Sequence, residues 1–316
     1  MSDPAVAFAL GHRQSAVESP NRKAWRRFQR NKPALASLVF LAAFLGVVLL
    51  WPLIAPYPPD AVSDAQFQSP GAAHWFGTDV HGRDLLTRVF YGARISLLVG
   101  VVGAGVAFVI GVTWGAVAGY AGGRVDAWMM RFVDVLYSLP SIIFVIVLIS
   151  TLDQVVKKLL TEAFGPNLAA ATPVLFLFVG LGAVSWLTMA RIVRGQVLSL
   201  RHRTFVEASR GLGAGPVRIL WHHILPNTLG VVIVYLTLTV PAIILYESFL
   251  SYLGLGIQPP MASWGSLIAE GAAQLNPIRI YWWLIVFPGA TMVTTLLALN
   301  FLGDGLRDAW DPRGQT

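Results

Sequence analysis

Six long runs of apolar residues constrain the fold of this chain more than any other feature of its sequence. The first, at 34–55, has 22 residues and no charged side chain, which is long enough for a helix to cross a hydrocarbon layer of ~30 Å. The other five lie at 95–120, 132–152, 173–190, 226–253 and 280–302. The sequence therefore predicts an all-α membrane protein with six transmembrane helices.

Composition separates this chain from two other classes of protein. Hydrophobic residues make up 55% of the 316 residues and charged residues 12%, against roughly 45–50% and roughly 25% in an average soluble protein. So much apolar surface excludes a disordered chain. The lack of cysteine excludes disulfides, a thiolate nucleophile and a cysteine-based metal site.

A cleaved signal peptide is the alternative for the first run, but Pro56 follows where a small-residue cleavage site is needed.

Positive charge predicts the orientation of the spans. Of the 23 Lys and Arg residues, 17 fall in 1–33, 121–131, 191–224 and 303–316, and 5 fall in 56–93, 153–172 and 254–279. Because cytoplasmic loops carry the excess, both termini are expected inside. The chain then divides into a basic cytoplasmic segment (1–33), a first span (34–55), an outer loop (56–94), a five-helix core (95–302) and a cytoplasmic tail (303–316). The net charge of +7 reports this orientation, and nucleic acid is not an expected partner.

Small residues recur every fourth position along the second run. They are Gly103, Ala107, Gly111, Gly115, Gly119 and Gly123. Such a ridge lets a second helix backbone approach closely. We therefore expect it to be a helix-packing face.

Enzymatic motifs are missing from the sequence. ATP hydrolysis on a P-loop needs Gly-Lys followed by Ser or Thr, but none of the four lysines follows a glycine. We therefore expect a chain that is not an enzyme and that binds no cofactor itself. The first outer loop carries His74, His81, Asp79 and Asp84, whose spacing favours a solvated loop over a metal site. Asp84 is expected to pair with Arg88 four residues on.

Ionisable residues inside spans are the default functional candidates. Asp134 follows Arg131 by three residues, which favours a local ion pair. Glu247 lies near the outer end of the fifth run and either faces a polar pathway or reaches outer water or a partner subunit. Glu247 and Trp186 are our candidates for pore or gate residues. Two isolated carboxylates also leave a proton-coupled secondary carrier open.

The predicted inner loop at 201–227 has the most explicit local chemistry. Thr204 and Glu207 fit a capping box that starts a helix near residue 205. Gly213 suits a left-handed cap at its end, and Pro216 suits the first position of a second helix. That helix is expected to end before Pro226 and to carry an apolar stripe of Val217, Leu220, Trp221 and Ile224. Two short helices joined by glycines result, which act either as an interfacial connector or as a docking element for a soluble partner.

The same loop resembles the EAA loop of the permease subunits of ABC importers. Glu207-Ala208-Ser209, Gly213 and Leu225-Pro226 match the motif, with Ser209 in place of the second alanine and His223 in place of the usual isoleucine. Similar strings elsewhere resemble the C-type permease of oligopeptide and dipeptide importers. They stand at 31–41, 74–100, 119–131, 185–200, 247–256 and 300–313, and the 185–200 segment is more like the oligopeptide form.

The resemblance implies a type I ABC importer permease fold with cytoplasmic coupling helices, in the bacterial inner membrane. Glu207, Ala208, Ser209, Gly213, Leu225 and Pro226 would belong to the element that docks on the ATPase. The implied partners are two cytoplasmic ATPase subunits that hold ATP and Mg, a second homologous permease, an extracytoplasmic peptide-binding protein facing 254–277, and membrane lipid. A permease for nickel or another solute, and a scaffold without a transport role, are the alternatives.

Overall fold

The computed structural model describes residues 20–164, 172–259 and 261–310. Residues 1–19 of the predicted basic segment, 165–171 and 260 of the predicted outer segments, and 311–316 of the predicted tail lie outside the described residues. Within the described ranges the chain is helical, and its strand-like pairing is one isolated bridge between Thr78 and Asp84.

Every predicted apolar run lies mainly in helical structure. The long helices are α3 (Lys32–Ile54), α4 (Leu85–Ala121), α5 (Gly123–Ser138), α6 (Ser141–Phe164), α8 (Thr172–Leu200), α11 (Leu225–Tyr252) and α13 (Trp283–Trp310). The short ones are α2 (Pro20–Arg30), α9 (Thr204–Gly211), α10 (Pro216–Ile219), the π-helix η1 (Leu220–Ile224) and α12 (Trp264–Ala273).

Four helical stretches in the described residues are long and apolar enough to cross a membrane. They are Lys32–Ile54, Leu85–Ala121, Pro216–Tyr252 and Trp283–Trp310, and the bent pair of α5 and α6 makes a fifth if it counts as one span. The all-α fold is confirmed. The count of six spans and the inside location of both ends stay predictions.

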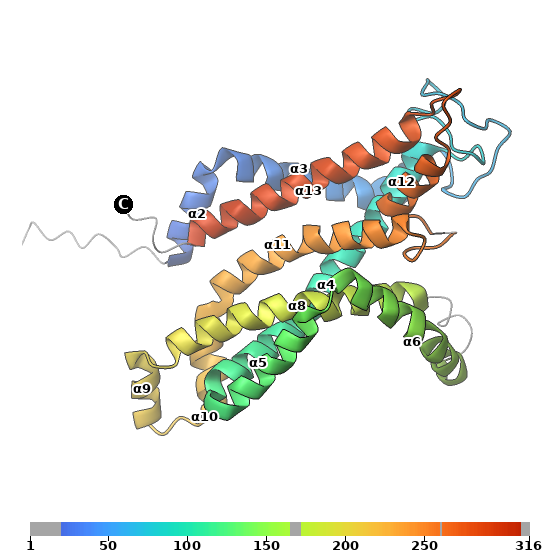
Figure 1. The fold of residues 1–316 in the computed structure, drawn as a ribbon. Helices are drawn as coiled ribbons and strands as arrows, with labels where there is room; N and C mark the ends of the chain where they lie inside the picture. Colours follow the sequence, from blue (N-terminus) through green and yellow to red (C-terminus); the bar gives the residue numbers. More distant parts are fainter. Residues whose placement is uncertain (1–19, 165–171, 260, 311–316) are drawn as a thin grey trace, which may run out of the picture.

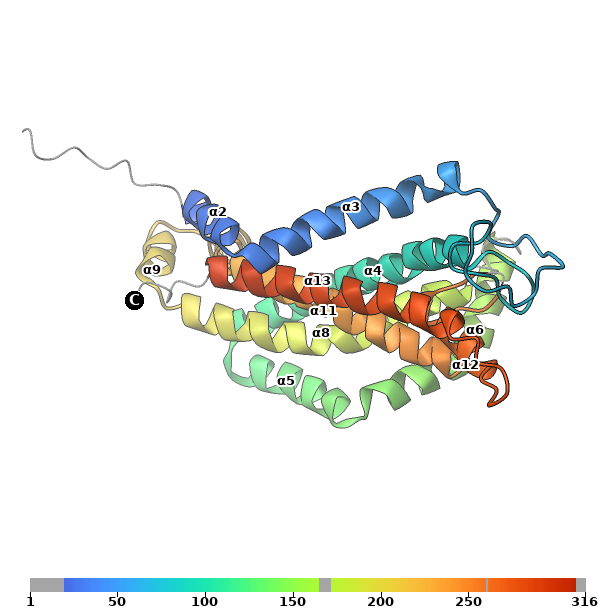
Figure 2. The same cartoon turned by 90° about the horizontal axis from the view of Figure 1, so that it is seen from above.

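The long helices form an elongated bundle with loops gathered at its two ends. Figure 1 shows α2 and α9 at one end, and the loop after α3 together with α12 at the other. Figure 2 shows α3 on one side of the bundle and α5 on the opposite side, with α4, α8, α11 and α13 between them. The described parts of two predicted inner segments, 1–33 and 191–224, thus contribute α2 and α9 to the same end of the bundle.

The ridge of small residues on α4 packs against α8, as predicted. A Cβ atom added at Gly111 would lie 2.6 Å from the Cβ atom of Met189, and one at Gly115 would clash with the backbone oxygen of Ala190. These two helices form the most extensive helix pair of the described fold. Gly123 has open space around its Cβ position, so it is not part of this contact.

The third predicted span is not one continuous helix, which corrects the expectation for 132–152. Helix α5 ends at Ser138, and α6 starts at Ser141 after a bend of 89°. Pro140 lacks a backbone donor and restrains the residue before it to extended backbone, and Leu139 has φ −80° and ψ 137°. The proline therefore breaks the span.

Helix ends differ from the ends of the apolar runs. Helix α4 starts ten residues earlier than the predicted second span, because the Asp84 carboxylate accepts a hydrogen bond of 2.9 Å from the backbone N–H of Thr87. Helix α6 continues to Phe164, inside the predicted outer segment. Helix α12 was not predicted, and its capping box is formed by Ser263 and Ser266. Hydropathy marks the apolar stretch and not the polar turns that extend a helix beyond it.

Candidate functional site

Two features of the described structure have the geometry of functional sites. One is the inner loop that joins α8 to α11 and contains α9, α10 and η1. The other is a hollow of about 490 Å³ lined by residues from 136–144, 183–188 and 235–246, which we call the central hollow. The sequence predicted the first and missed the second.

The predicted start of α9 is right in position and wrong in mechanism. The helix begins at Thr204 after Arg203, whose backbone is extended with φ −78° and ψ 149°, and no side chain of this described segment caps its first N–H groups. Thr204 is therefore the first helical residue and not the cap, so the predicted Thr204–Glu207 capping box does not form. What holds α9 in place is Val206, which is fully buried.

The predicted end of α9 at Gly213 is confirmed. Gly213 has φ +83°, in the left-handed region that favours glycine. Its N–H donates to the carbonyl oxygen of Arg210 at 2.9 Å, and the N–H of Ala214 donates to that of Ser209 at 3.0 Å. Both bonds belong to the Schellman cap that closes a helix with a left-handed residue. The turn between α9 and α10 is therefore fixed by these two hydrogen bonds, and both require the left-handed backbone of Gly213.

The second short helix does not end at Pro226, which corrects the sequence prediction. Pro216 starts α10 as expected, but α10 continues through η1 into α11 as one helical stretch, Pro216–Tyr252. In η1 the N–H of Leu225 donates to the carbonyl oxygen of Leu220, five residues back. Pro226 has no backbone N–H, and in a regular α-helix its ring would clash with the carbonyl group four residues back. The wider π turn accommodates both features.

The predicted apolar stripe on the second helix is half buried and half exposed. Leu220 and Ile224 are buried, but Val217 and Trp221 are 70% and 55% exposed. Ile219, which lies outside the predicted stripe, is also buried. Together with Phe205 and with Leu212, which is 89% exposed, Val217 and Trp221 form the exposed apolar residues of the loop. We call these four residues the inner patch.

The residues of the EAA resemblance are distributed over the loop and the start of α11. Glu207, Ala208 and Gly213 are exposed, and Ser209 donates from its hydroxyl to the carbonyl oxygen of Phe205 at 2.8 Å. Leu225 is buried in the cluster that also holds Val206 and Ile224, while Pro226 is exposed. The motif therefore combines an outward-facing part with a buried attachment to the spans.

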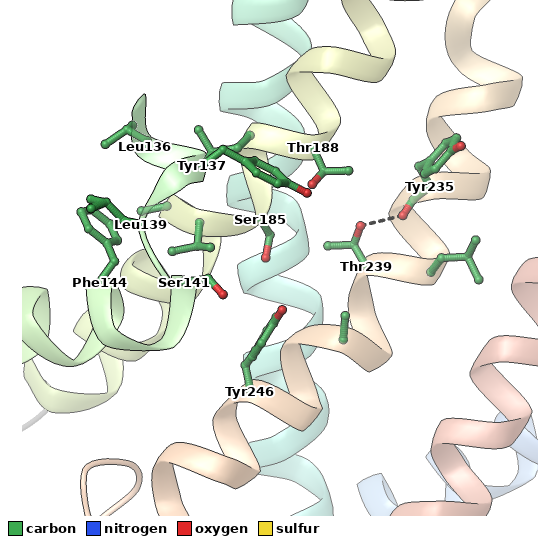
Figure 3. A pocket seen from close by; sticks show the side chains of 15 residues that line it. Leu136, Tyr137, Leu139, Ser141, Phe144, Ser185, Thr188, Tyr235, Thr239 and Tyr246 are labelled. Carbon is green, nitrogen blue, oxygen red and sulfur yellow. Dashed lines mark hydrogen bonds between the residues drawn. The ribbon is translucent and has the colours of Figure 1, made fainter. Parts of the chain in front are cut away.

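The central hollow lies where the broken α5–α6 pair faces α8 and α11. Figure 3 shows the hydroxyl groups of Tyr137, Ser141, Thr188 and Tyr246 around it, contributed by four different helices. The bend at Pro140 brings both sides of the break, Leu139 and Ser141, to its wall. A proline inside an otherwise apolar run is the sequence signal that could have indicated it.

Neither predicted pore or gate residue lines the central hollow. Trp186 is 6% exposed and packs edge-on against Trp114, with ring centroids 5.2 Å apart. Glu247 is fully buried, with Ser251 donating to its carboxylate at 2.6 Å and Ser96 of α4 at 3.3 Å. A carboxylate enclosed by serines does not face a polar pathway within this chain, so that expectation for Glu247 is not supported.

The ion pair predicted for Asp134 has another partner. Asp134 bonds Arg191 of α8 at 2.6 Å in place of Arg131. Arg191 also lies over the ring of Tyr137, with its guanidinium carbon 4.1 Å from the ring centroid. The partner comes from a different helix, and spacing in the sequence does not predict contacts between helices.

The first outer loop is also more ordered than predicted. Asp84 binds His74 at 2.9 Å and caps α4, and it does not pair with Arg88. Arg88 is 4% exposed and instead donates to Asp79 at 2.7 Å and to Glu270 of α12 at 2.6 Å. This cluster ties the loop and α12 to the start of α4, so the loop is not simply solvated.

Two protein families match this chain, and together their matches include both candidate sites. Residues 111–315 match the family described as binding-protein-dependent transport system inner membrane component. Residues 19–70 match the N-terminal transmembrane domain of oligopeptide transport permease C. The match thus includes the inner loop, the central hollow and the first span.

Curated relatives cover nearly the whole chain. The oligopeptide transport system permease protein OppC of Haemophilus influenzae is 44% identical over 314 residues, which span 96% of this chain and 93% of that protein. OppC of Escherichia coli is 45% identical over 94% of both chains. The dipeptide transport system permease protein DppC of Bacillus subtilis is 45% identical over 93% of this chain and 86% of its own length.

A solved structure shows the same fold. The inward-facing methionine ABC transporter MetNI contains a chain that aligns with a TM-score of 0.52 at 21% identity, and the alignment covers 71% of this chain and 97% of that one. At this identity the likeness concerns the fold, which is that of a type I ABC importer permease. With the family match over residues 111–315 and relatives of about 45% identity, this chain belongs to the binding-protein-dependent transport system inner membrane component family.

Proposed function

We propose that this chain is the membrane-spanning permease subunit of an ATP-driven peptide importer in a bacterial inner membrane. It forms half of the translocation pore and contains no ATP-hydrolysing motif of its own. The observation that carries the proposal is the inner loop, which presents Glu207 and Ala208 beside the exposed apolar inner patch. A surface of that kind is suited to burial against a protein partner.

The partners follow from the same loop and from the family. One of two cytoplasmic ATPase subunits would dock on the inner patch of this chain, and the two would hold ATP and Mg, while this chain binds no cofactor. A second homologous permease would complete the pore, and an extracytoplasmic binding protein would deliver peptide at the end that carries α12 (Figure 1). No nucleic acid is involved.

Oligopeptides are our preferred substrate class. The relatives named for oligopeptide and for dipeptide transport are about equally similar to this chain, so their identity does not separate the two. Our preference rests on the oligopeptide-like segment 185–200, which supplies Ser185 and Thr188 to the wall of the central hollow. A proton-coupled carrier is disfavoured, because Asp134 pairs with Arg191 and Glu247 is enclosed by serines.

Charge reversal at Glu207 tests the docking role. In proteoliposomes holding the permease pair and both ATPases, with peptide-loaded binding protein supplied, Glu207→Lys should lower peptide uptake more than tenfold. It should also weaken the stimulation of ATP hydrolysis by loaded binding protein. Glu162→Lys is the matched control, because Glu162 is exposed on α6 and outside the loop. Normal uptake by the Glu207→Lys complex would refute the docking role.

A further inference from the structure

We infer that the central hollow is a binding subsite for the main chain of the passing peptide and that it does not select for side-chain charge. The inference rests on the proposed function and extends it to a site in this chain. It is drawn from the chemistry of the lining, from the hydroxyls left without partners and from the way the neighbouring charges are neutralised.

The lining is polar but neutral. None of the described residues that line the hollow is Asp, Glu, Lys, Arg or His. Its polar side chains all carry hydroxyl groups, on Tyr137, Ser141, Ser185, Thr188, Tyr235, Thr239 and Tyr246. An ionised wall would attract one sign of side chain and repel the other, whereas hydroxyls both donate and accept hydrogen bonds and carry no charge. A peptide bond also has one donor and one acceptor, so the two are complementary for any side chain.

Five of these hydroxyls have no protein partner in the part of the chain that the structure describes. Ser185 donates to the carbonyl oxygen of Leu181 at 3.0 Å and Thr239 to that of Tyr235 at 2.6 Å, so both are used within their own helices. The hydroxyls of Tyr137, Ser141, Thr188, Tyr235 and Tyr246 have no such bond, and Figure 3 shows these residues around the hollow. Lipid cannot satisfy such groups, so water, a ligand or the partner permease must.

A pair of opposite charges lies beside Tyr137 at the edge of the hollow. Arg191 pairs with Asp134 at 2.6 Å while its guanidinium lies on the ring of Tyr137. The ion pair removes the net charge, and the stacking holds the tyrosine ring at the wall. The volume of about 490 Å³ lies within the range of ~300–1,000 Å³ found for ligand pockets.

Removing two of the free hydroxyls tests the inference. In the reconstituted complex, Tyr137→Phe combined with Tyr246→Phe should lower uptake of Ala-Ala-Ala, Ala-Lys-Ala and Ala-Glu-Ala by about 4- to 100-fold, since each of the two lost hydrogen bonds is worth roughly 2- to 10-fold. The factor should be the same for all three peptides. Tyr252→Phe is the control, because Tyr252 lies on the same helix outside the hollow, and its effect should stay below twofold. Unchanged uptake by the double variant would overturn the inference.

Adding a charge tests neutrality. Thr188→Asp should favour Ala-Lys-Ala over Ala-Glu-Ala by about tenfold, because the new carboxylate attracts one side chain and repels the other. Equal uptake of both peptides by this variant would show that they pass elsewhere. If the unmodified complex imports none of the three peptides, the proposed function fails, and the occupancy of the hollow is then decided by labelling.

Labelling distinguishes a ligand-filled hollow from one filled by the partner permease. The chain has no cysteine, so a single Thr188→Cys substitution gives one reactive position on this subunit. We expect a water-soluble maleimide to modify it in the complex, and Ala-Ala-Ala at saturating concentration to slow the modification at least fivefold. No modification, or modification that the peptide does not slow, would contradict the subsite.

Discussion

Gly213 fixes the direction in which the chain leaves α9. Its φ of +83° costs an ordinary L-residue roughly 1–2 kcal/mol, and two hydrogen bonds of the cap depend on it. Space is not the constraint, because nothing lies within 4 Å of its Cβ position. The residue therefore acts through backbone conformation alone.

A methyl group at this position should weaken ATPase docking. We expect Gly213→Ala to bias the loop away from its closed turn by roughly 1–2 kcal/mol, which is a loss of about 5- to 30-fold in the docking-competent population. The measurement is the affinity of the purified permease pair for its ATPases. Gly211→Ala is the matched control: Gly211 is helical, also has open space around it, and has no positive φ. Equal affinities of the two variants would show that the left-handed turn is dispensable.

At the scale of helices, the contact between α4 and α8 is the framework that positions both functional features. Helix α8 leads into the inner loop at one end and supplies Ser185 and Thr188 to the central hollow along its length. The close approach depends on the small residues of α4, because lipid does not press apolar helices together as water does. A larger side chain on that ridge should displace α8 and so disturb both the inner loop and the central hollow.

Gly115→Ala should destabilise the fold by roughly 1–3 kcal/mol, because the added methyl group would collide with the carbonyl oxygen of Ala190 and over-pack the interface. A denaturation titration in detergent micelles would measure the loss. Gly105→Ala on the same helix has open space and should be neutral or slightly stabilising, since alanine is the better helix former. Similar unfolding midpoints for both variants would contradict this account.

Periodicity and turn chemistry predicted the features that depend on neighbours in sequence. The apolar runs, the α4 ridge, the left-handed Gly213 and the start of α10 at Pro216 are of this kind. The features that were missed depend on tertiary contacts. Arg191 reaches Asp134 from another helix, Arg88 reaches Glu270 across 182 positions, and the central hollow needs three separate segments. The π turn before Pro226 was missed because a proline is ordinarily expected to end a helix, whereas a wider turn lets the helix continue through it.

At the scale of the whole molecule, each end of the bundle carries an exposed apolar side chain that can report its side of the membrane. One end carries the inner loop with Leu212, and the other carries the segment after α12 with Ile278, and these side chains are 89% and 88% exposed. Charge distribution predicts that the first end faces the cytoplasm.

Labelling from one side of the membrane tests this orientation. In intact cells stripped of their outer membrane, a membrane-impermeant maleimide should modify Ile278→Cys directly and Leu212→Cys only after the inner membrane is permeabilised. The cysteine-free chain is its own negative control. The reverse order of labelling would invert the predicted topology, and the docking proposal would fail with it.

The unbroken helix from Pro216 to Tyr252 has a consequence in time. It begins at the inner loop and carries Tyr235, Thr239 and Tyr246 along the wall of the central hollow, with no coil segment between them. A flexible joint would let the loop relax first and the wall later, as two separate kinetic phases. A helix without a coil segment has no such joint, even though Pro226 and Pro241 each remove one backbone donor from it, so reporters placed at the two positions should relax with a single shared rate constant after ATP is added.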